Sequence, residues 1–99
     1  MVDDTQVRGE IICAMGNRIE GLERLERVLK VRASLEYAYH PALAHARSVT
    51  GLCALAAGQR SRAVDLATQA REAFTAQPGV SDYFELPLKE LDRRLQSKS

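Results

Sequence analysis

Glycine recurs in this sequence at a fixed spacing, and that spacing limits the available folds more than any other feature. Gly9 and Gly51 are separated by the same interval as Gly16 and Gly58. Gly16 and Gly58 each begin a polar turn, with the sequences Gly-Asn-Arg and Gly-Gln-Arg. Self-similarity with a fixed period is typical of stacked structural repeats, in which each unit buries its apolar face against a neighbour. The sequence therefore predicts two copies of one supersecondary unit.

The composition favours helices for these units. Of the 99 residues, 14 are alanine and 12 are leucine, whereas only 5% are aromatic and none is tryptophan. Sheets prefer β-branched and aromatic residues, so a chain with this balance is expected to be all-α. Its length corresponds to one domain.

The first unit contains two predicted helices, over about residues 4–15 and about residues 18–36. The first has an apolar stripe at helical spacing, and Gly16 ends it because glycine adopts the left-handed conformation of a helix C-terminus. The stripe and its N-cap are assigned to Val7, Ile11 and Ala14, with Asp3 or Asp4 as the cap. The second helix buries Leu22, Leu25 and Leu29, with Val28, Val31 and Leu35 beside them, and its outer face carries the acid-first pairs Glu20–Arg24, Glu23–Arg27 and Glu26–Lys30.

The second unit begins at Pro41, since proline suits the first turn of a helix. Helices are predicted over about residues 42–57 and 60–76. Gly51 lies inside the first of them and predicts a close helix–helix crossing, because glycine there costs about 1 kcal/mol relative to alanine. A last helix, capped by Ser81 or Asp82, has one apolar stripe. That stripe consists of Phe84, Leu88, Leu91 and Leu95.

These features resemble the tetratricopeptide repeat. The small residues from Ala46 to Phe74 carry the resemblance, and the long period with the His40-Pro41 pair is similar to the kinesin-light-chain type. The resemblance implies a right-handed α-α superhelix of two helix-turn-helix repeats and a C-terminal capping helix. The single domain covers residues 1–99, with repeat one at about 2–43, repeat two at about 44–85 and the capping helix at about 82–97.

The function implied by the resemblance is binding of a partner protein or peptide. The first helix of each pair lines the concave side of such a stack, and so predicts the groove-facing residues. These candidates are Gln6, Glu10, Cys13, His45, Ser48, Leu52, Leu55, Glu90 and Arg94. Chaperone-binding members of the family hold a C-terminal carboxylate with Lys, Asn and Arg. Of that set only Arg94 is present here, so such a ligand is not expected.

Other functions lack support in the sequence. The formal net charge is +1, and Arg24, Arg27 and Lys30 are each expected to pair with an acid, so no nucleic-acid surface is predicted. No apolar run reaches the roughly 20 residues of a membrane span. His40 and His45 lack the spacing of a helical metal pair, and His40 is expected in a loop or a cap. We therefore expect no enzyme activity, metal or cofactor, and a cytoplasmic location.

The two cysteines, Cys13 and Cys53, are far apart in the sequence and form no Cys-x-x-Cys pair. In a chain without a secretory signal, such cysteines are usually buried thiols. We therefore expect two free thiols in the core and no disulfide framework.

The apolar residues of the first helix spread over more than one face, through Ile11, Ile12 and Met15. A terminal repeat normally has a polar outer face. Two interpretations follow: earlier repeats of a longer protein cover this end, or two copies of the chain pair through it. The resemblance permits a larger bacterial signalling protein, such as a protein kinase or regulator. Structural self-association is the alternative to partner binding.

Overall fold

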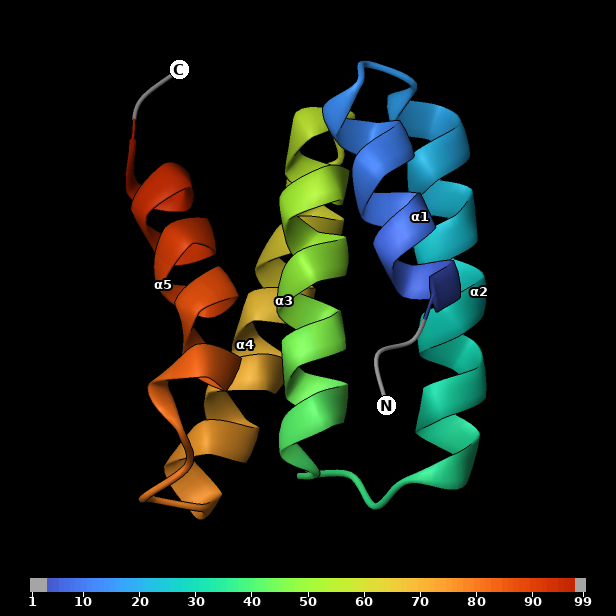
Figure 1. The fold of residues 1–99 in the computed structure, drawn as a ribbon. Helices are drawn as coiled ribbons and strands as arrows, with labels where there is room; N and C mark the ends of the chain where they lie inside the picture. Colours follow the sequence, from blue (N-terminus) through green and yellow to red (C-terminus); the bar gives the residue numbers. More distant parts are fainter. Residues whose placement is uncertain (1–3, 98–99) are drawn as a thin grey trace.

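The computed structural model describes residues 4–97, and these form five α-helices without a strand (Figure 1). The helices are α1 (Asp4–Ala14), α2 (Arg18–Leu35), α3 (Pro41–Ala56), α4 (Arg60–Ala76) and α5 (Asp82–Gln96). Helices α1 and α2 form one hairpin and α3 and α4 a second, while α5 follows as a single helix. Helix α3 is central, because it contacts all four others. The all-α fold of two helical pairs plus one helix is confirmed.

The same turn ends the first helix of both pairs. Gly16 has φ +100° and Gly58 has φ +83°, values that glycine adopts without strain. After α1, the backbone N–H of Asn17 donates to the carbonyl of Ile12. The equivalent bond after α3 joins Gln59 to Ala54, which is the same pair of positions one repeat later. Both turns are Schellman motifs, and their identity confirms the sequence period.

The helix starts are capped by side chains where the sequence predicts caps. The Nδ1 atom of His40 accepts a hydrogen bond from the backbone N–H of Ala42 at 3.0 Å, so His40 caps α3. The Ser81 hydroxyl accepts from the backbone N–H of Tyr83 at 3.3 Å and caps α5. Helix α1 starts at Asp4; the other predicted cap, Asp3, lies outside the described residues. Such caps satisfy backbone donors that a helix leaves unpaired.

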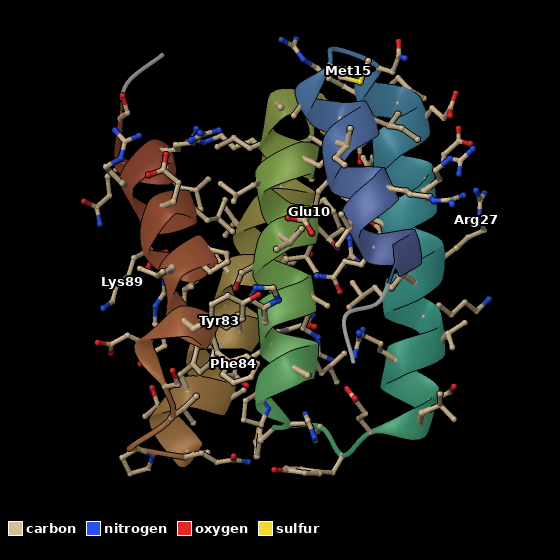
Figure 2. All side chains as sticks on the ribbon, in the orientation of Figure 1. Glu10, Met15, Arg27, Tyr83, Phe84 and Lys89 are labelled. Atoms are coloured by element: carbon tan, nitrogen blue, oxygen red, sulfur yellow. A yellow bond between two sulfur atoms is a disulfide. The ribbon has the colours of Figure 1, made fainter. Side chains whose placement is uncertain are left out.

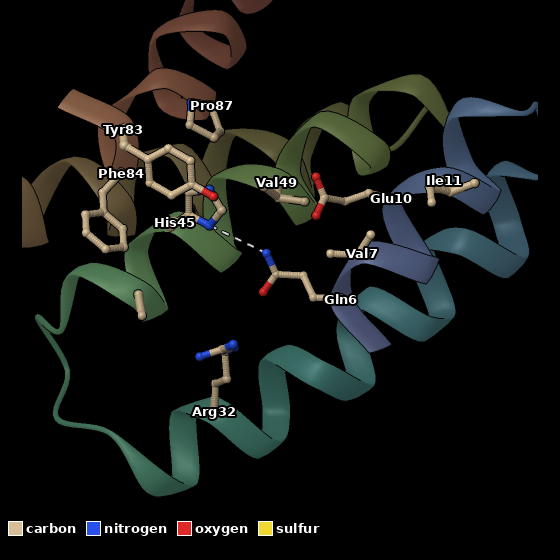
Figure 3. A pocket seen from close by; sticks show the side chains of 11 residues that line it. Gln6, Val7, Glu10, Ile11, Arg32, His45, Val49, Tyr83, Phe84 and Pro87 are labelled. Carbon is tan, nitrogen blue, oxygen red and sulfur yellow. Dashed lines mark hydrogen bonds between the residues drawn. The ribbon is translucent and has the colours of Figure 1, made fainter. Parts of the chain in front are cut away.

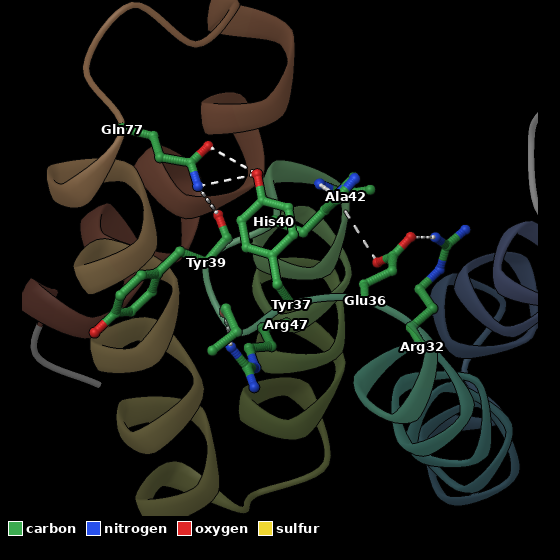
Figure 4. A network of polar contacts seen from close by, with 9 residues as sticks. Arg32, Glu36, Tyr37, Tyr39, His40, Ala42, Arg47 and Gln77 are labelled. Atoms are coloured by element: carbon green, nitrogen blue, oxygen red, sulfur yellow. Dashed lines mark hydrogen bonds and ion pairs between the residues drawn. The ribbon is translucent and has the colours of Figure 1, made fainter.

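A polar network connects the loop between the two repeats to the end of α4 (Figure 4). The Gln77 amide nitrogen donates to the Tyr39 carbonyl at 2.9 Å and to the Tyr37 hydroxyl at 3.1 Å. Arg47 donates to the Ala38 carbonyl at 3.2 Å. These contacts fix residues 37–39 against the second helical pair, so the loop joins the repeats at a defined spacing.

The core lies along α3, α4 and the inner faces of α2 and α5. The inward-facing positions of α4 are buried, and so are Leu88 and Leu91 of the α5 stripe. Gly51 permits the predicted close crossing, because a Cβ atom there would lie 2.6 Å from Cδ2 of Leu91. The fully or nearly fully buried residues of α4 are Ala63, Leu66, Ala67, Ala70, Ala73 and Phe74.

One predicted apolar face is wrong and a second is correct only as far as Leu29. On α1 the buried face consists of Gln6, Gly9 and Cys13, whereas Ile11 and Ala14 are exposed. Gly9 and Gly21 let α1 and α2 approach closely, and this approach selects the face with small residues over the face with larger apolar ones. On α2 the buried face ends at Leu29, so Val31 and Leu35 are exposed.

The charged outer faces are partly as predicted. Arg27 and Lys89 point outward on opposite sides of the molecule (Figure 2). The Glu20–Arg24 pair is present at 3.3 Å. Glu26, however, binds Arg62 of α4 rather than Lys30, with both carboxylate oxygens at 2.7 and 2.8 Å. A bidentate guanidinium bond is stronger than a pair along one helix, which explains the difference.

Candidate functional site

A groove is hollowed between α1, α3 and α5, the helices expected to form the concave side (Figure 3). Its volume is about 710 Å³. Helix α1 supplies one wall, the first turn of α5 the opposite wall, and α3 the floor between them. The lining residues are Gln6, Val7, Glu10, Ile11, Arg32, Ala42, His45, Val49, Tyr83, Phe84 and Pro87.

An aromatic cluster forms the α5 side of the groove. The His45 ring stacks on the Tyr83 ring with centroids 5.4 Å apart and planes at 15°. Phe84 meets both rings edge-on, with its centroid 6.0 Å from His45 and 5.5 Å from Tyr83. Such arrangements suit the ring quadrupoles and stabilise a pair by about 0.5–1.5 kcal/mol beyond burial. The cluster fixes the first turn of α5 over the first half of α3.

A hydrogen bond crosses the groove from α1 to α3. The side-chain nitrogen of Gln6 lies 3.5 Å from Nδ1 of His45, as Figure 3 shows. Gln6 is itself buried, so its amide is held between the two helices. This contact connects α1 to α3 across the groove.

The pKa values of two groups that line the groove, His45 and Glu10, shift in opposite directions. Burial lowers the pKa of His45, and the positive charge of Arg32 lowers it further. Burial raises the pKa of Glu10, and a hydrogen bond from Gln6 opposes part of that rise. In both cases desolvation disfavours the charged form. At neutral pH the imidazole of His45 in the groove wall is therefore uncharged, and the carboxyl group of Glu10 is poorly solvated.

Acidification is expected to destabilise the protein through His45. Its folded-state pKa lies below the unfolded value of 6.5, so the unfolded chain binds the extra proton more tightly. The His45 contribution is complete above pH 6.5 and is lost as the pH falls through the folded pKa. Urea midpoints measured from pH 8 to pH 5 should fall more for the wild type than for His45→Gln. Parallel curves for the two proteins would contradict this assignment.

A smaller cavity of about 190 Å³ adjoins the groove and shares Glu10 and Val49 with it. Cys13 and Cys53 lie in its lining, and they are joined by a disulfide with Cα atoms 6.0 Å apart. The prediction of two free thiols is therefore wrong. The sequence separation of 40 is almost one repeat period, which places the two cysteines at nearly the same height on the neighbouring helices α1 and α3.

The match to a family model identifies the family of this chain. A family model described as tetratricopeptide repeat matches residues 4–76, which contain α1 to α4. The chain belongs to the tetratricopeptide repeat family. No curated protein and no solved structure matches the chain significantly. Tetratricopeptide repeats form helical superhelices and generally mediate protein–protein interactions, so a general role in protein interaction follows from the family.

The groove of this tetratricopeptide repeat contains only part of the predicted set. Gln6, Glu10 and His45 line it, whereas Cys13, Leu52 and Arg94 line the smaller cavity. Ser48 is fully buried and donates to the Ala44 carbonyl at 2.9 Å, so no partner reaches it. The last two candidates, Leu55 and Glu90, line neither cavity: Leu55 packs against the core and Glu90 binds Arg93 and Arg94.

The aromatic wall was not predicted from the sequence as part of the groove. Phe84 appears there only as a member of the core stripe, and Tyr83 beside it is 62% exposed. Pro87 lies inside α5 and lacks the N–H that would bond the Tyr83 carbonyl, but it does not indicate where that helix packs.

Within residues 4–97, no group of three or more His, Cys, Asp or Glu side chains is placed to hold a metal ion. Over the same range, no helix is long and apolar enough to cross a bilayer. The groove presents a neutral imidazole, a carboxylate, an amide, the Arg32 guanidinium and aromatic rings. This set is suited to contacting a polypeptide.

Proposed function

We propose that this tetratricopeptide repeat holds a segment of a partner protein in the groove between α1, α3 and α5. The observation that carries the proposal is the groove itself: about 710 Å³, with apolar and aromatic walls and a few fixed polar groups. Binding sites of this kind combine apolar area, which supplies affinity, with polar groups that fix orientation. The groove is lined by α1 and α3, the first helices of the two pairs, and we expect first helices to line the binding surface of stacked repeats.

Peptide selection with a structural readout tests this function. Random dodecapeptides displayed on phage are selected on the folded protein, and the selected peptides are titrated into ¹⁵N-labelled protein. We expect amide shifts concentrated at Gln6, Val7, His45 and Tyr83. Ile11→Asn should weaken binding by about tenfold, because an exposed apolar contact in the groove is lost.

Val64→Asn is the matched control, since Val64 is 45% exposed on α4 and Ile11 is 52% exposed on α1. It should change the dissociation constant by less than about twofold, as expected for a surface site away from the interface. Shifts that map to α4, or equal effects of the two variants, would show that the groove is not the binding surface.

A second function, self-association, is favoured by the exposed apolar residues at the α1–α2 turn. Met15 is 75% exposed and Ile19 is 59% exposed, and Met15 lies at the end of the molecule (Figure 2). Sedimentation over a concentration series tests self-association. A dimer that Met15→Asn dissociates supports self-association, whereas a monomer throughout excludes it.

Several finer predictions rest only on the resemblance to the family. They are the kinesin-light-chain type of the repeat, the repeat limits at about 2–43 and 44–85, the cytoplasmic location, and membership of a larger bacterial signalling protein. The disulfide and the cytoplasmic location point in opposite directions, since cytosolic reductants keep most thiols reduced.

A further inference from the structure

We propose that the occupant of the groove is a basic and apolar segment. It places a lysine or arginine side chain against Glu10 and an apolar side chain against Tyr83 and Pro87. This inference rests on the proposed function, because it names the chemistry of the partner that the groove holds.

The first part of the argument is the charge left uncompensated in the groove. Arg32 pairs with Glu36 at 3.4 Å, and Arg94 of the adjoining cavity pairs with Glu90 at 2.6 Å. Within the described residues Glu10 makes no ion pair, and its one polar partner there is the neutral side chain of Gln6. Arg32 and Arg94 therefore each have an acidic partner, whereas the carboxylate of Glu10 has no cationic partner among the described residues.

The position of Glu10 makes that charge accessible to a ligand. Glu10 is partly buried and lines both the groove and the smaller cavity, so a segment in either one passes its carboxylate. Burial already disfavours its charged form, as its raised pKa indicates. A cation supplied by the ligand restores the interaction energy that water no longer provides, whereas an acidic ligand adds repulsion.

The second part of the argument is the opposite wall. Tyr83 is 62% exposed even though His45 stacks on its ring, and Pro87 lies one turn further along α5. Figure 3 shows this wall across the groove from Glu10, with Val49 of α3 between them. A tyrosine fixed by stacking offers apolar area at little cost in conformational entropy. A segment that crosses α3 thus meets an acid at one side and a rigid apolar surface at the other.

A positional-scanning library tests the chemistry of the occupant. The octapeptides are acetylated and amidated, so that their termini carry no charge, and one position at a time is fixed as arginine, lysine, citrulline, glutamate or leucine. Binding is measured by fluorescence polarisation. At one position the arginine and lysine pools should bind about tenfold more tightly than the citrulline pool. At another, the leucine pool should bind most tightly.

Variants assign each preference to its wall. Glu10→Gln should reduce the advantage of arginine over citrulline to less than about twofold, since it removes the charge and keeps the shape. Tyr83→Ala should weaken the arginine and citrulline pools equally and abolish the leucine preference. Glu72→Gln, an exposed acid on α4 outside the groove, is the control and should change neither preference. Thermal melts establish that each variant is folded.

The outcomes separate this inference from the proposed function. If pools bind with shifts in the groove but arginine and citrulline bind equally, the basic occupant is wrong while groove binding stands. If Glu10→Gln keeps the arginine preference, the pairing of the basic side chain with Glu10 is wrong. A preference for glutamate overturns the basic occupant while groove binding stands. If no pool binds in the groove, both proposals fail.

Discussion

Replacing Cys13 and Cys53 together by alanine is expected to lower the free energy of unfolding by about 4 kcal/mol, the largest single effect expected in this molecule. The disulfide joins α1 to α3 across a sequence separation of 40. Its loss increases the conformational entropy of the unfolded chain, and longer loops give larger effects. Urea unfolding of the oxidised wild type and of the double variant measures the difference.

Reduction of the wild type provides the control for this prediction. In dithiothreitol the wild type should unfold at nearly the midpoint of the double variant, because both then lack the crosslink. Alanine also removes two buried sulfur atoms, so the variant should be slightly the less stable of the two. A difference below about 1 kcal/mol between oxidised and reduced wild type would contradict the expected role of the disulfide.

The consequence for function is local. Helix α1 supplies one wall of the groove and packs mainly on α2. It is connected to the floor of the groove by the disulfide, by the Gln6–His45 hydrogen bond and by a small contact to α3. Breaking the crosslink therefore removes a restraint on the distance between Glu10 and the aromatic wall. Peptide affinity should decline with reduction if the groove is the binding surface, since a preorganised site loses less entropy on binding.

The second large effect is expected at the crossing of α3 and α5. Leu91 is fully buried, so Leu91→Ala should cost about 3 kcal/mol through lost burial and the cavity that remains. Leu86→Ala on the same helix is the control, because Leu86 is 57% exposed, and it should cost less than about 0.5 kcal/mol. Urea midpoints with unchanged slopes measure both. Equal costs at the two positions would refute the packing of α5.

A double-mutant cycle with Gly51 isolates the contact itself. A Cβ atom at Gly51 would lie 2.6 Å from Cδ2 of Leu91, and its other neighbours are at ordinary distances. In the wild type, Gly51→Ala should cost about 1–3 kcal/mol through overpacking, of which about 1 kcal/mol is offset by the higher helix propensity of alanine. In the Leu91→Ala background the clash is absent, and the same change should stabilise the helix by about 1 kcal/mol. Additive effects would exclude direct contact.

The helix limits were predictable because they depend on nearby residues. Gly16 and Gly58 end their helices through their own backbone freedom, and His40 and Ser81 cap helices that begin at the next residue. Each of these signals acts within a few positions along the chain. The glycine period then implies that the two pairs are copies, and the match to the family follows from the same positions.

The candidate site was only partly predictable. Placing Gln6, Glu10 and His45 in the groove needs only the rule that first helices line the concave side. Placing Tyr83 there requires the crossing of α5 over α3, which depends on Gly51 and Leu91 packing across the interface. Side chains on helices far apart in sequence meet according to crossing angle and side-chain volume, which a pattern along one helix does not contain.

The sequence by itself determined the repeat, the five helices, their ends and the family, since each is encoded by spacing or by a local backbone preference. The tertiary structure alone decided which face of α1 is buried, that Cys13 bonds Cys53, that Glu26 binds Arg62, and that an aromatic wall stands opposite Glu10. These contacts form between residues on different helices, far apart along the chain, and close packing of the helices selects them.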